Sequence, residues 1–422
     1  MDVTGLSALL EPDGWALLQS LPPYDAVDPM VLSERLRGQG HDPGLVAAAL
    51  TQSRLRAAAV AKFGPFAAEL IYTADGLEQA TRLPVAARHA RRFVEAAVAS
   101  VADLGCGIGA DSLAMAGLGL RVEAVDLDPV TAAVATVNLR HVGGDVTVRH
   151  ADATDFPDGF SAVDAAWADP GRRAAGRRIN DPQRWLPPLS WATSLASTGV
   201  KAVGVKVAPG LDHGLVDHEA GWQAEWTSVD GDVVEGVLWW GTAAVPGVRR
   251  SAVVLGTTGM AGAAGPAAAV ASGGADVVEL ARVDDTDAPP AADVGIGEVG
   301  AVLYEPDGAV IRAGLVTAVA VAVGGRLIDP TIAYITAEAG AMTTPLAKAY
   351  SVEAVLPWGL KRLRAYLVSH GVGSVVVKRR GSPIEPEELR RALRLSGPRS
   401  ATVILTRSGT RRIAIVCQPV PR

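Results

Sequence analysis

The spacing of apolar residues along the chain changes near residue 100. Before that point apolar positions recur three and four residues apart, and between residues 45 and 70 charged side chains such as Arg54, Arg56 and Lys62 stand among them. This period is typical of amphipathic helices. We therefore expect residues 1–92 to form a helical N-terminal domain with a cofactor lid.

From residue 101 onward, short apolar runs alternate with longer amphipathic segments. This alternation is typical of a parallel sheet covered by helices, here in a domain of residues 93–260. The runs 225–240 and 251–256 are expected to be antiparallel strands at the edge of the sheet. The other predicted elements are helices at 110–118 and 129–142, and strands at 101–104, 122–127, 146–150, 162–168 and 202–207.

The remaining chain divides into two parts. Residues 261–274 are rich in Ala and Gly, as expected of a linker, and we assign 261–344 to a linker and accessory segment. Residues 345–422 again mix apolar runs with amphipathic stretches, which predicts a small α/β domain. Its predicted elements are helices at 352–370 and 385–395, and strands at 374–378, 401–406 and 412–417.

Charge is divided unevenly between these parts. Residues 345–422 hold 15 Lys and Arg against four Asp and Glu, a formal charge of +11, whereas the first 344 residues carry −17. A basic module on an acidic body suggests a polyanionic partner such as nucleic acid. A basic face that contacts only solvent would give the same charges, so both interpretations stay open.

Nothing in the sequence suggests secretion, membrane insertion or metal binding. The longest apolar stretch, residues 313–325, is too short to span a bilayer, and no signal-peptide pattern follows Met1. The two cysteines, Cys106 and Cys417, have neither disulfide nor metal-site spacing. We expect a cytoplasmic protein without a metal.

A glycine-rich turn separates the first predicted strand from the helix that follows it, in the segment Val101-Ala-Asp-Leu-Gly-Cys-Gly-Ile-Gly-Ala-Asp111. Because glycine has no Cβ atom, Gly105, Gly107 and Gly109 allow a ligand to approach the backbone closely. Asp103, at the strand end, can accept a hydrogen bond from an ammonium group. Glycine turns also occur in purely structural roles, so the turn alone does not define a ligand.

Three more acidic residues follow the ends of later predicted strands: Asp126, Asp152 and Asp169. The carboxyl ends of parallel strands meet at one edge of an open sheet, where ligands bind. Asp126 is placed to accept from ribose hydroxyls and Asp152 from the adenine amino group. Together with Asp103, these acids predict a nucleoside-binding crevice.

The glycine spacing favours S-adenosylmethionine over a dinucleotide. The dinucleotide fingerprint has two residues between its second and third glycines, whereas Gly107 and Gly109 are separated by one. S-Adenosylmethionine has no phosphate but carries an ammonium and a sulfonium group, which suit an acidic rim.

With these residues the chain resembles class I S-adenosylmethionine-dependent methyltransferases, and more closely the bacterial members with a C-terminal THUMP-like domain. The resemblance covers residues 71–422 and implies an α/β fold with a Rossmann-like seven-stranded methyltransferase sheet, with S-adenosylmethionine as cofactor. Besides the glycine turn it rests on Tyr72-Thr-Ala-Asp-Gly-Leu-Glu-Gln-Ala-Thr81, Trp167-Ala-Asp-Pro-Gly-Arg-Arg173, Lys206-Val-Ala-Pro-Gly210, Tyr304-Glu-Pro-Asp307 and Lys378-Arg-Arg-Gly381.

The resemblance also implies roles for single residues. The glycine turn and Asp103 would hold the methionine part of the cofactor, Asp126 the ribose and Asp152 the adenine. Residues 73–81 are similar in placement to the loop that covers the cofactor in cap-hypermethylating and rRNA guanine-N2 methyltransferases; a locally capped helix start is the alternative. The expected cofactor-binding residues are Thr73, Asp103, Gly105, Gly107, Gly109, Asp126 and Asp152.

On the substrate side, Asp169 and Pro170 are the expected catalytic residues. They occupy the position where amino-methyltransferases have an Asp or Asn, two prolines and an aromatic residue, which align an exocyclic nitrogen with the methyl group. This chain departs from that pattern, with Gly171 for the second proline and Arg172 for the aromatic residue. A guanidinium can also stack on a base, so a nucleic-acid substrate stays open.

Basic residues follow the Asp-Pro-Gly segment, and phosphate oxygens are natural partners for them. Lys206, at the end of the fifth strand, either reaches the same crevice or pairs with an acid at the sheet edge. Because THUMP domains are associated with RNA binding, the resemblance implies RNA as a partner of the basic tail. The expected substrate-binding residues are Arg172, Arg173, Lys206, Lys378, Arg379 and Arg380.

Three classes of function are compatible with the sequence. The first is an enzyme that transfers a methyl group from S-adenosylmethionine to an RNA base nitrogen. The second is a non-catalytic RNA-binding protein with a degenerate methyltransferase fold, which the Asp-Pro-Gly departure favours. The third is a methyltransferase acting on a small molecule or a protein, which would leave the basic tail unexplained.

Overall fold

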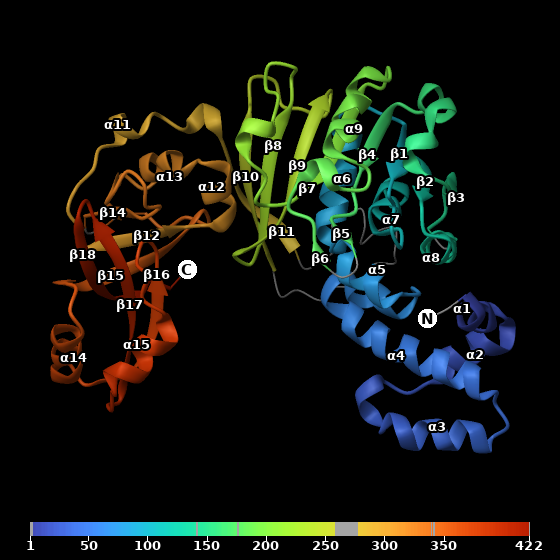
Figure 1. Cartoon of the computed structure of the whole chain (residues 1–422), viewed down its shortest axis with the longest axis horizontal. Helices are drawn as coiled ribbons and strands as arrows, with labels where there is room; N and C mark the ends of the chain where they lie inside the picture. The colour runs from blue at the N-terminus through green and yellow to red at the C-terminus, as the bar shows by residue number, and fades with distance from the viewer. Residues whose placement is uncertain are drawn as a thin grey trace.

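A computed structural model describes residues 3–421 except 141, 175–176, 258–276, 339 and 341. Two lobes lie side by side, one built on a nine-stranded sheet and the other on a seven-stranded sheet (Figure 1). The N-terminal helices pack beside the first lobe, and the C-terminal strands belong to the second (Figure 1). In the described residues, no helix is both long and apolar enough to cross a bilayer.

The N-terminal region is helical, as predicted. Aspartates begin two of its helices: the side chain of Asp28 accepts from the N–H groups of Met30 and Val31, and that of Asp42 from the N–H group of Leu45. Such caps satisfy N–H groups that have no partner inside the helix. The helices are α1 (Val3–Leu10), α2 (Pro12–Ser20), α3 (Pro29–Gly38), α4 (Pro43–Phe63), α5 (Ala74–Gln79) and α6 (Leu83–Glu95).

The first sheet has the strand order β11-β10-β8-β9-β7-β4-β1-β2-β3. Its parallel part, β1 (Ser100–Leu104), β2 (Arg121–Asp126), β3 (Val146–His150), β4 (Ala165–Ala168) and β7 (Ala202–Val207), matches the predicted strands closely. β8 (Gln223–Val229) and β9 (Asp232–Gly241) complete seven strands. Helices α7 (Ala110–Gly117), α8 (Pro129–Leu139) and α9 (Leu189–Ser194) fall between these strands in the sequence.

Two further strands extend this sheet to nine. β10 (Arg250–Thr257) pairs in parallel with β8, and β11 (Val277–Asp284) pairs antiparallel with β10. The expectation that residues 251–256 run antiparallel at the edge is therefore wrong for the pair with β8. The reason is the connection between β9 and β10. It leads from the end of β9 past the start of β8, so that β10 starts at the same end of the sheet as β8 and runs in the same direction.

The second lobe has the strand order β13-β14-β12-β15-β18-β17-β16. Its strands are β12 (Val302–Pro306), β13 (Arg326–Leu327), β14 (Ile335–Ala337), β15 (Ala347–Pro357), β16 (Val372–Arg379), β17 (Arg399–Ser408) and β18 (Arg411–Pro419). Its helices are α11 (Ala291–Val294), α12 (Gly308–Ala313), α13 (Val316–Ala322), α14 (Leu360–Ser369) and α15 (Pro386–Leu393).

One predicted helix in this lobe is half wrong. Of residues 352–370, only the second part is helical, because β15 runs through Pro357 and pairs with β18. Residues 352–357 alternate between half-buried and exposed, which is the period of a strand. The predicted linker 261–274 lies outside the described residues.

Both lobes contribute to one hydrophobic core. Trp226, Val254 and Val283 of the first sheet belong to the same buried cluster as Tyr304 and Val310 of the second lobe. α12 packs against β8 and β10. The second lobe therefore packs against the part of the first sheet that contains β8 and β10. The carboxyl ends of β1, β2 and β4 belong to the other part of the sheet.

Candidate functional site

Backbone hydrogen bonds join the ends of three parallel strands. The N–H groups of Gly105 and Cys106 both donate to the carbonyl of Val125 at 2.9 Å, and the N–H of Asp169 donates to the carbonyl of Leu104 at 3.1 Å. The glycine turn after β1 is thus held between the end of β2 and the end of β4.

The turn requires its glycines. Gly105 and Gly109 have φ values of +87° and +89°, a region that side-chain-bearing residues rarely adopt. A Cβ atom on Gly105 would lie 2.9 Å from the carbonyl oxygen of Asp169, and one on Gly109 would lie 3.3 Å from Leu139. The N–H of Gly107 donates to Asp126 Oδ2 at 2.9 Å, which links the turn to the acid at the end of β2.

A cavity of about 1280 Å³ opens at these strand ends. It brings together most of the residues that the sequence predicts for the site, and adds lining residues that the sequence did not single out, such as Val85, Leu186 and Glu235. The predicted residues on its wall are Thr73, Gly105, Gly107, Asp126, Asp152, Asp169, Pro170, Arg172 and Lys206.

Asp103 and Gly109 do not line this cavity. Asp103 is buried beneath the turn, where its Oδ2 accepts from the hydroxyl of Ser112 at 2.5 Å and its Oδ1 has no hydrogen-bond partner among the described residues. Burial, together with the nearby carboxylate of Asp111, raises the pKa of Asp103 to about 8. Asp103 therefore lies behind the glycine turn, and Gly109 begins α7.

Lys206 meets both of the alternatives that the sequence left open for it, because it lines the cavity and pairs with an acid at the sheet edge. Its Nζ donates to Asp169 Oδ2 and to the hydroxyl of Thr81, both at 2.7 Å. Burial alone would lower the pKa of Lys206, but Asp169, Asp111 and Glu235 outweigh it and raise the pKa. The ammonium group and Asp169 form an ion pair on the cavity wall.

A buried polar network continues from this pair. Thr81 donates to Asp111 Oδ2 at 2.7 Å, and His89 lies between Asp111 Oδ1 at 2.7 Å and Glu235 Oε1 at 2.5 Å. Burial would lower the pKa of His89, but Glu235 and Asp111 raise it to about 9. Sequence patterns do not reveal this network, because its members come from separate elements and share no local motif.

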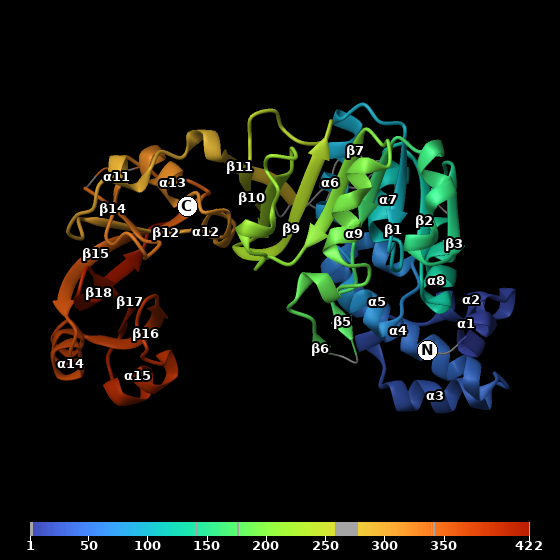
Figure 2. The same ribbon diagram turned by 45° about the horizontal axis from the view of Figure 1, so that its top comes forward.

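Basic residues that follow Asp169 line another part of the cavity wall. Arg172 and Arg178 line it, and Gly171 exchanges two backbone hydrogen bonds with Leu186, at 2.7 and 3.1 Å. The short hairpin β5 (Arg173–Ala174) and β6 (Arg177–Arg178) lies next to α5 in both views (Figures 1 and 2). The side chain of Arg173 lies outside the described residues.

The predicted basic residues of the tail lie in the second lobe and do not line the cavity. Lys378 contacts Glu305, and Arg379 pairs with Glu385 at 2.6 Å. Arg380 donates to a backbone carbonyl at 3.1 Å and lies over the ring of Tyr334. All three side chains therefore already have partners within the lobe.

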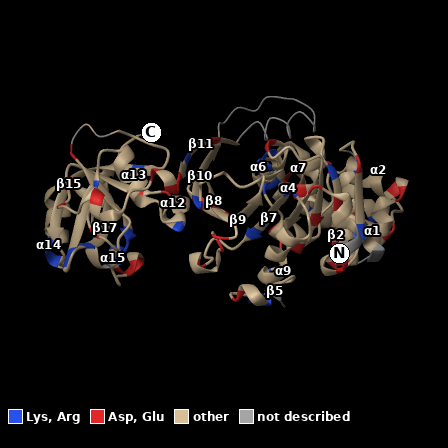
Figure 3. Cartoon of the chain, turned by 90° about the horizontal axis from the view of Figure 1, so that it is seen from above, with Lys and Arg blue, Asp and Glu red and all other residues tan. Residues whose placement is uncertain are grey.

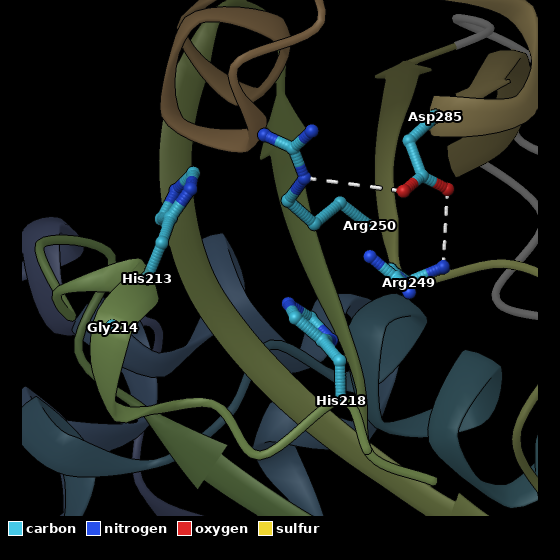
Figure 4. Close-up of a pocket in the computed structure, with 6 residues that line it drawn as sticks. All are labelled: His213, Gly214, His218, Arg249, Arg250 and Asp285. Atoms are coloured by element: carbon cyan, nitrogen blue, oxygen red, sulfur yellow. Dashed lines mark hydrogen bonds and ion pairs between the residues drawn. The ribbon is translucent and has the colours of Figure 1, made fainter.

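A second, smaller cavity of about 360 Å³ lies where α12 meets the first sheet (Figure 4). His213 Nε2 donates to the carbonyl of Arg312 at 2.7 Å, and Arg250 donates to that of Ala313 at 3.1 Å. Asp285 accepts from the backbone N–H of Arg249 at 3.0 Å. These contacts bind the last turn of α12, so the basic groups here serve the junction of the lobes.

The sheet order, the glycine turn and the strand-end cavity define a Rossmann-like fold of the methyltransferase type. A solved structure supports this class: a putative methyltransferase from Porphyromonas gingivalis W83 superposes with a TM-score of 0.74 over 97% of this chain and 99% of that chain, at 18% identity. Family models describe residues 101–171 as a methyltransferase domain, 347–419 as THUMP domain-like and 2–59 as a domain of unknown function.

Curated relatives make the family specific. Two strains of Mycobacterium tuberculosis, CDC 1551 / Oshkosh and ATCC 25618 / H37Rv, each have an uncharacterized S-adenosylmethionine-dependent methyltransferase that is 34% identical to this chain over 359 residues. The match covers 83% of this chain and 89% of each relative. The chain belongs to the family of S-adenosylmethionine-dependent methyltransferases and is an enzyme that uses this cofactor.

The described residues fit the cofactor on chemical grounds. The glycine turn leaves a cradle that a Cβ atom on Gly105 would distort, and Asp126 and Asp152 place carboxylates on the same wall. The positive φ values of Gly105 and Gly107 turn the backbone toward this space.

A matched pair of glycine substitutions tests the turn. Gly105 and Gly119 share a φ of +87°, but a Cβ atom on Gly119 would meet nothing within 4 Å. We expect Gly119→Ala to lose about 1–2 kcal/mol of unfolding free energy for its φ alone, and Gly105→Ala to lose more, because its Cβ atom would also meet a backbone oxygen. Only Gly105→Ala should also weaken S-adenosylmethionine binding in calorimetry, because its new methyl group contacts Asp169. Equal affinities for the two variants would contradict this role of the turn.

We expect Asp126→Ala to weaken S-adenosylmethionine binding by about tenfold or more, since charge-assisted hydrogen bonds to the ribose would be lost. Calorimetry measures the affinity. Asp145→Ala, at an exposed acid outside the cavity, serves as the control and should bind normally. Unchanged affinity in Asp126→Ala would remove this residue from the site.

The raised pKa of His89 predicts a pH-dependent stability. Its protonated form is favoured in the folded state, so its stabilisation is complete below about pH 6.5, the ordinary pKa of His, and is lost as the pH rises through about 9. The difference in unfolding free energy between the wild type and His89→Gln should shrink by about 3 kcal/mol over this window. Denaturant titrations at several pH values measure it, and a constant difference would contradict the assignment.

Proposed function

We propose that this enzyme transfers a methyl group from S-adenosylmethionine to an exocyclic nitrogen of an RNA base. One observation carries the proposal: Asp169, a strand-end carboxylate held by the buried ammonium of Lys206, lines the same cavity as the glycine turn. A carboxylate in this place can accept an N–H group of an amino acceptor.

In this proposal the cofactor occupies the part of the cavity at the ends of β1, β2 and β3. When bound, S-adenosylmethionine supplies an activated methyl group on its sulfonium. Gly105 and Gly107 pass close to the methionine part, Asp126 binds the ribose and Asp152 the adenine, with Thr73 on the covering segment. Asp103, one layer deeper, acts through the turn rather than by direct contact.

Asp169 and the following Pro170 would orient the acceptor. A carboxylate that accepts one N–H of an amino group fixes the direction of the nitrogen lone pair, and methyl transfer by direct displacement depends strongly on such alignment. Lys206 is already occupied by Asp169 and Thr81. Its proposed role is therefore to hold Asp169, while Arg172 and Arg178 face the substrate.

RNA as the substrate rests on charge and on the C-terminal domain. The segment 345–422 has a formal charge of +11, and its THUMP domain-like match suggests RNA binding. Lys361 and Arg362 on α14 are exposed, and basic residues appear at this helix in Figure 3. We propose that domain 345–422 guides RNA to domain 93–260, with Lys378, Arg379 and Arg380 adding to its positive field.

Asp169→Ala should reduce turnover at least about 100-fold and leave S-adenosylmethionine affinity within about twofold, because the residue aligns the acceptor rather than the cofactor. The assay incubates the protein with labelled S-adenosylmethionine and unmodified total RNA. Asp155→Ala, at an exposed acid that does not line the cavity, should remain active.

The same assay separates the alternative substrates. Label in RNA from the wild type alone supports the proposal. Label only in protein or small-molecule fractions would replace RNA with another acceptor, and full activity of Asp169→Ala would remove this residue from the catalytic site.

A further inference from the structure

A polar network of six side chains borders the cavity, whose wall includes five of them. Only Asp169 has substantial exposure, at 25% of its side chain, and the others are nearly completely buried. They come from the end of β4, β7, the segment after α5, α6, α7 and β9. In the order of their hydrogen bonds, the six are Asp169, Lys206, Thr81, Asp111, His89 and Glu235.

Chemistry allows only one arrangement of protons in this chain. A lysine ammonium only donates and a carboxylate only accepts, so the Thr81 hydroxyl must accept from Lys206 and donate to Asp111. His89 lies between two carboxylates, so both ring nitrogens donate and the ring is an imidazolium. Lys206 therefore donates to both Asp169 and Thr81, Thr81 donates to Asp111, and His89 donates to both Asp111 and Glu235.

The surroundings of this network are largely apolar. Around His89 the core is aromatic, with the rings of Trp167, Trp239 and Phe93 packed together. Apolar side chains of similar volume generally replace buried ion networks at no cost or with a gain in stability. A costly polar network that borders a large cavity is typical of a functional site.

The network also contacts the segment that covers the cofactor side of the cavity. Lys62 of α4 donates to the carbonyls of Leu77, Glu78 and Ala80 at 2.6–2.8 Å, which fixes the end of α5. Thr81 follows directly. The hydroxyl that holds Lys206 is therefore part of the same backbone segment as Thr73.

We propose that Lys206 and Thr81 are positioning residues: together they occupy Asp169 Oδ2, leave Oδ1 for the N–H of the methyl acceptor, and join the placement of Asp169 to that of residues 73–81. This inference rests on the role proposed above for Asp169. Lys206 Nζ bonds Asp169 only through Oδ2, and among the described residues Oδ1 has no hydrogen-bond partner. The site accordingly selects methyl acceptors that have an N–H group able to donate a hydrogen bond to a carboxylate.

An isosteric substitution tests the hydroxyl. Thr81→Val keeps the side-chain shape and removes the link, so kcat should fall about tenfold or more, while KM for RNA and the affinity for S-adenosylmethionine change less than twofold. Thr81→Ser should restore kcat. The control Thr193→Val removes a hydroxyl that bonds only backbone carbonyls of α9 and should behave as the wild type. A fall in cofactor affinity instead of kcat, or no rescue by Ser, would overturn the proposal.

A second measurement does not depend on the substrate. Lys206→Met should lower the thermal unfolding midpoint by about 4 °C or more, because it leaves buried carboxylates without their cation. Adding Asp169→Asn should recover at least half of that loss. If the two changes lower the midpoint additively, the ion pair is not coupled and the proposal is wrong. If the wild type does not methylate RNA, only the proposed function is wrong. The unfolding midpoints of these variants would still show whether Lys206 and Asp169 are coupled.

Discussion

The end of β1 is the constraint on which the rest of the site depends. Leu104, its last residue, accepts from the N–H of Asp169, and the next two N–H groups donate to the end of β2. These bonds bring the glycine turn and Asp169 so close that no side chain fits on Gly105. The proposed cofactor and acceptor sites would therefore share one wall, as methyl transfer between them requires.

The same closeness explains the distribution of charge. Repulsion is expected among the carboxylates of Asp103, Asp111, Asp126 and Asp169. The protein reduces this repulsion in different ways. The pKa of Asp103 is raised to about 8 by burial and by Asp111, which favours its neutral form at neutral pH. Lys206 supplies a cation for Asp169, and Asp126 accepts backbone N–H groups. Burial, Lys206 and backbone N–H groups thus offset the repulsion among these acids.

The sequence predicted what local patterns determine. Strand period, the glycine turn and the acids after each strand located β1–β4, β7 and the strand-end part of the cavity wall, because each is set by neighbouring residues. The parallel direction of β10 depends on how a loop crosses the sheet edge. The partners of His89 and Thr81 come from elements far apart in sequence, so only the packed structure shows them. Residues 352–357 alternate in burial as a strand does, but the predicted helix 352–370 includes them because the helix α14 follows directly.

The most direct test of the account is a crystal structure of the protein with S-adenosylhomocysteine, the product form of the cofactor. The account predicts the homocysteine part beside Gly105 and Gly107, the ribose hydroxyls on Asp126, the sulfur facing Asp169, and Lys206 still bonded to that carboxylate. A ligand bound elsewhere, or a cavity filled by the protein's own side chains, would contradict it.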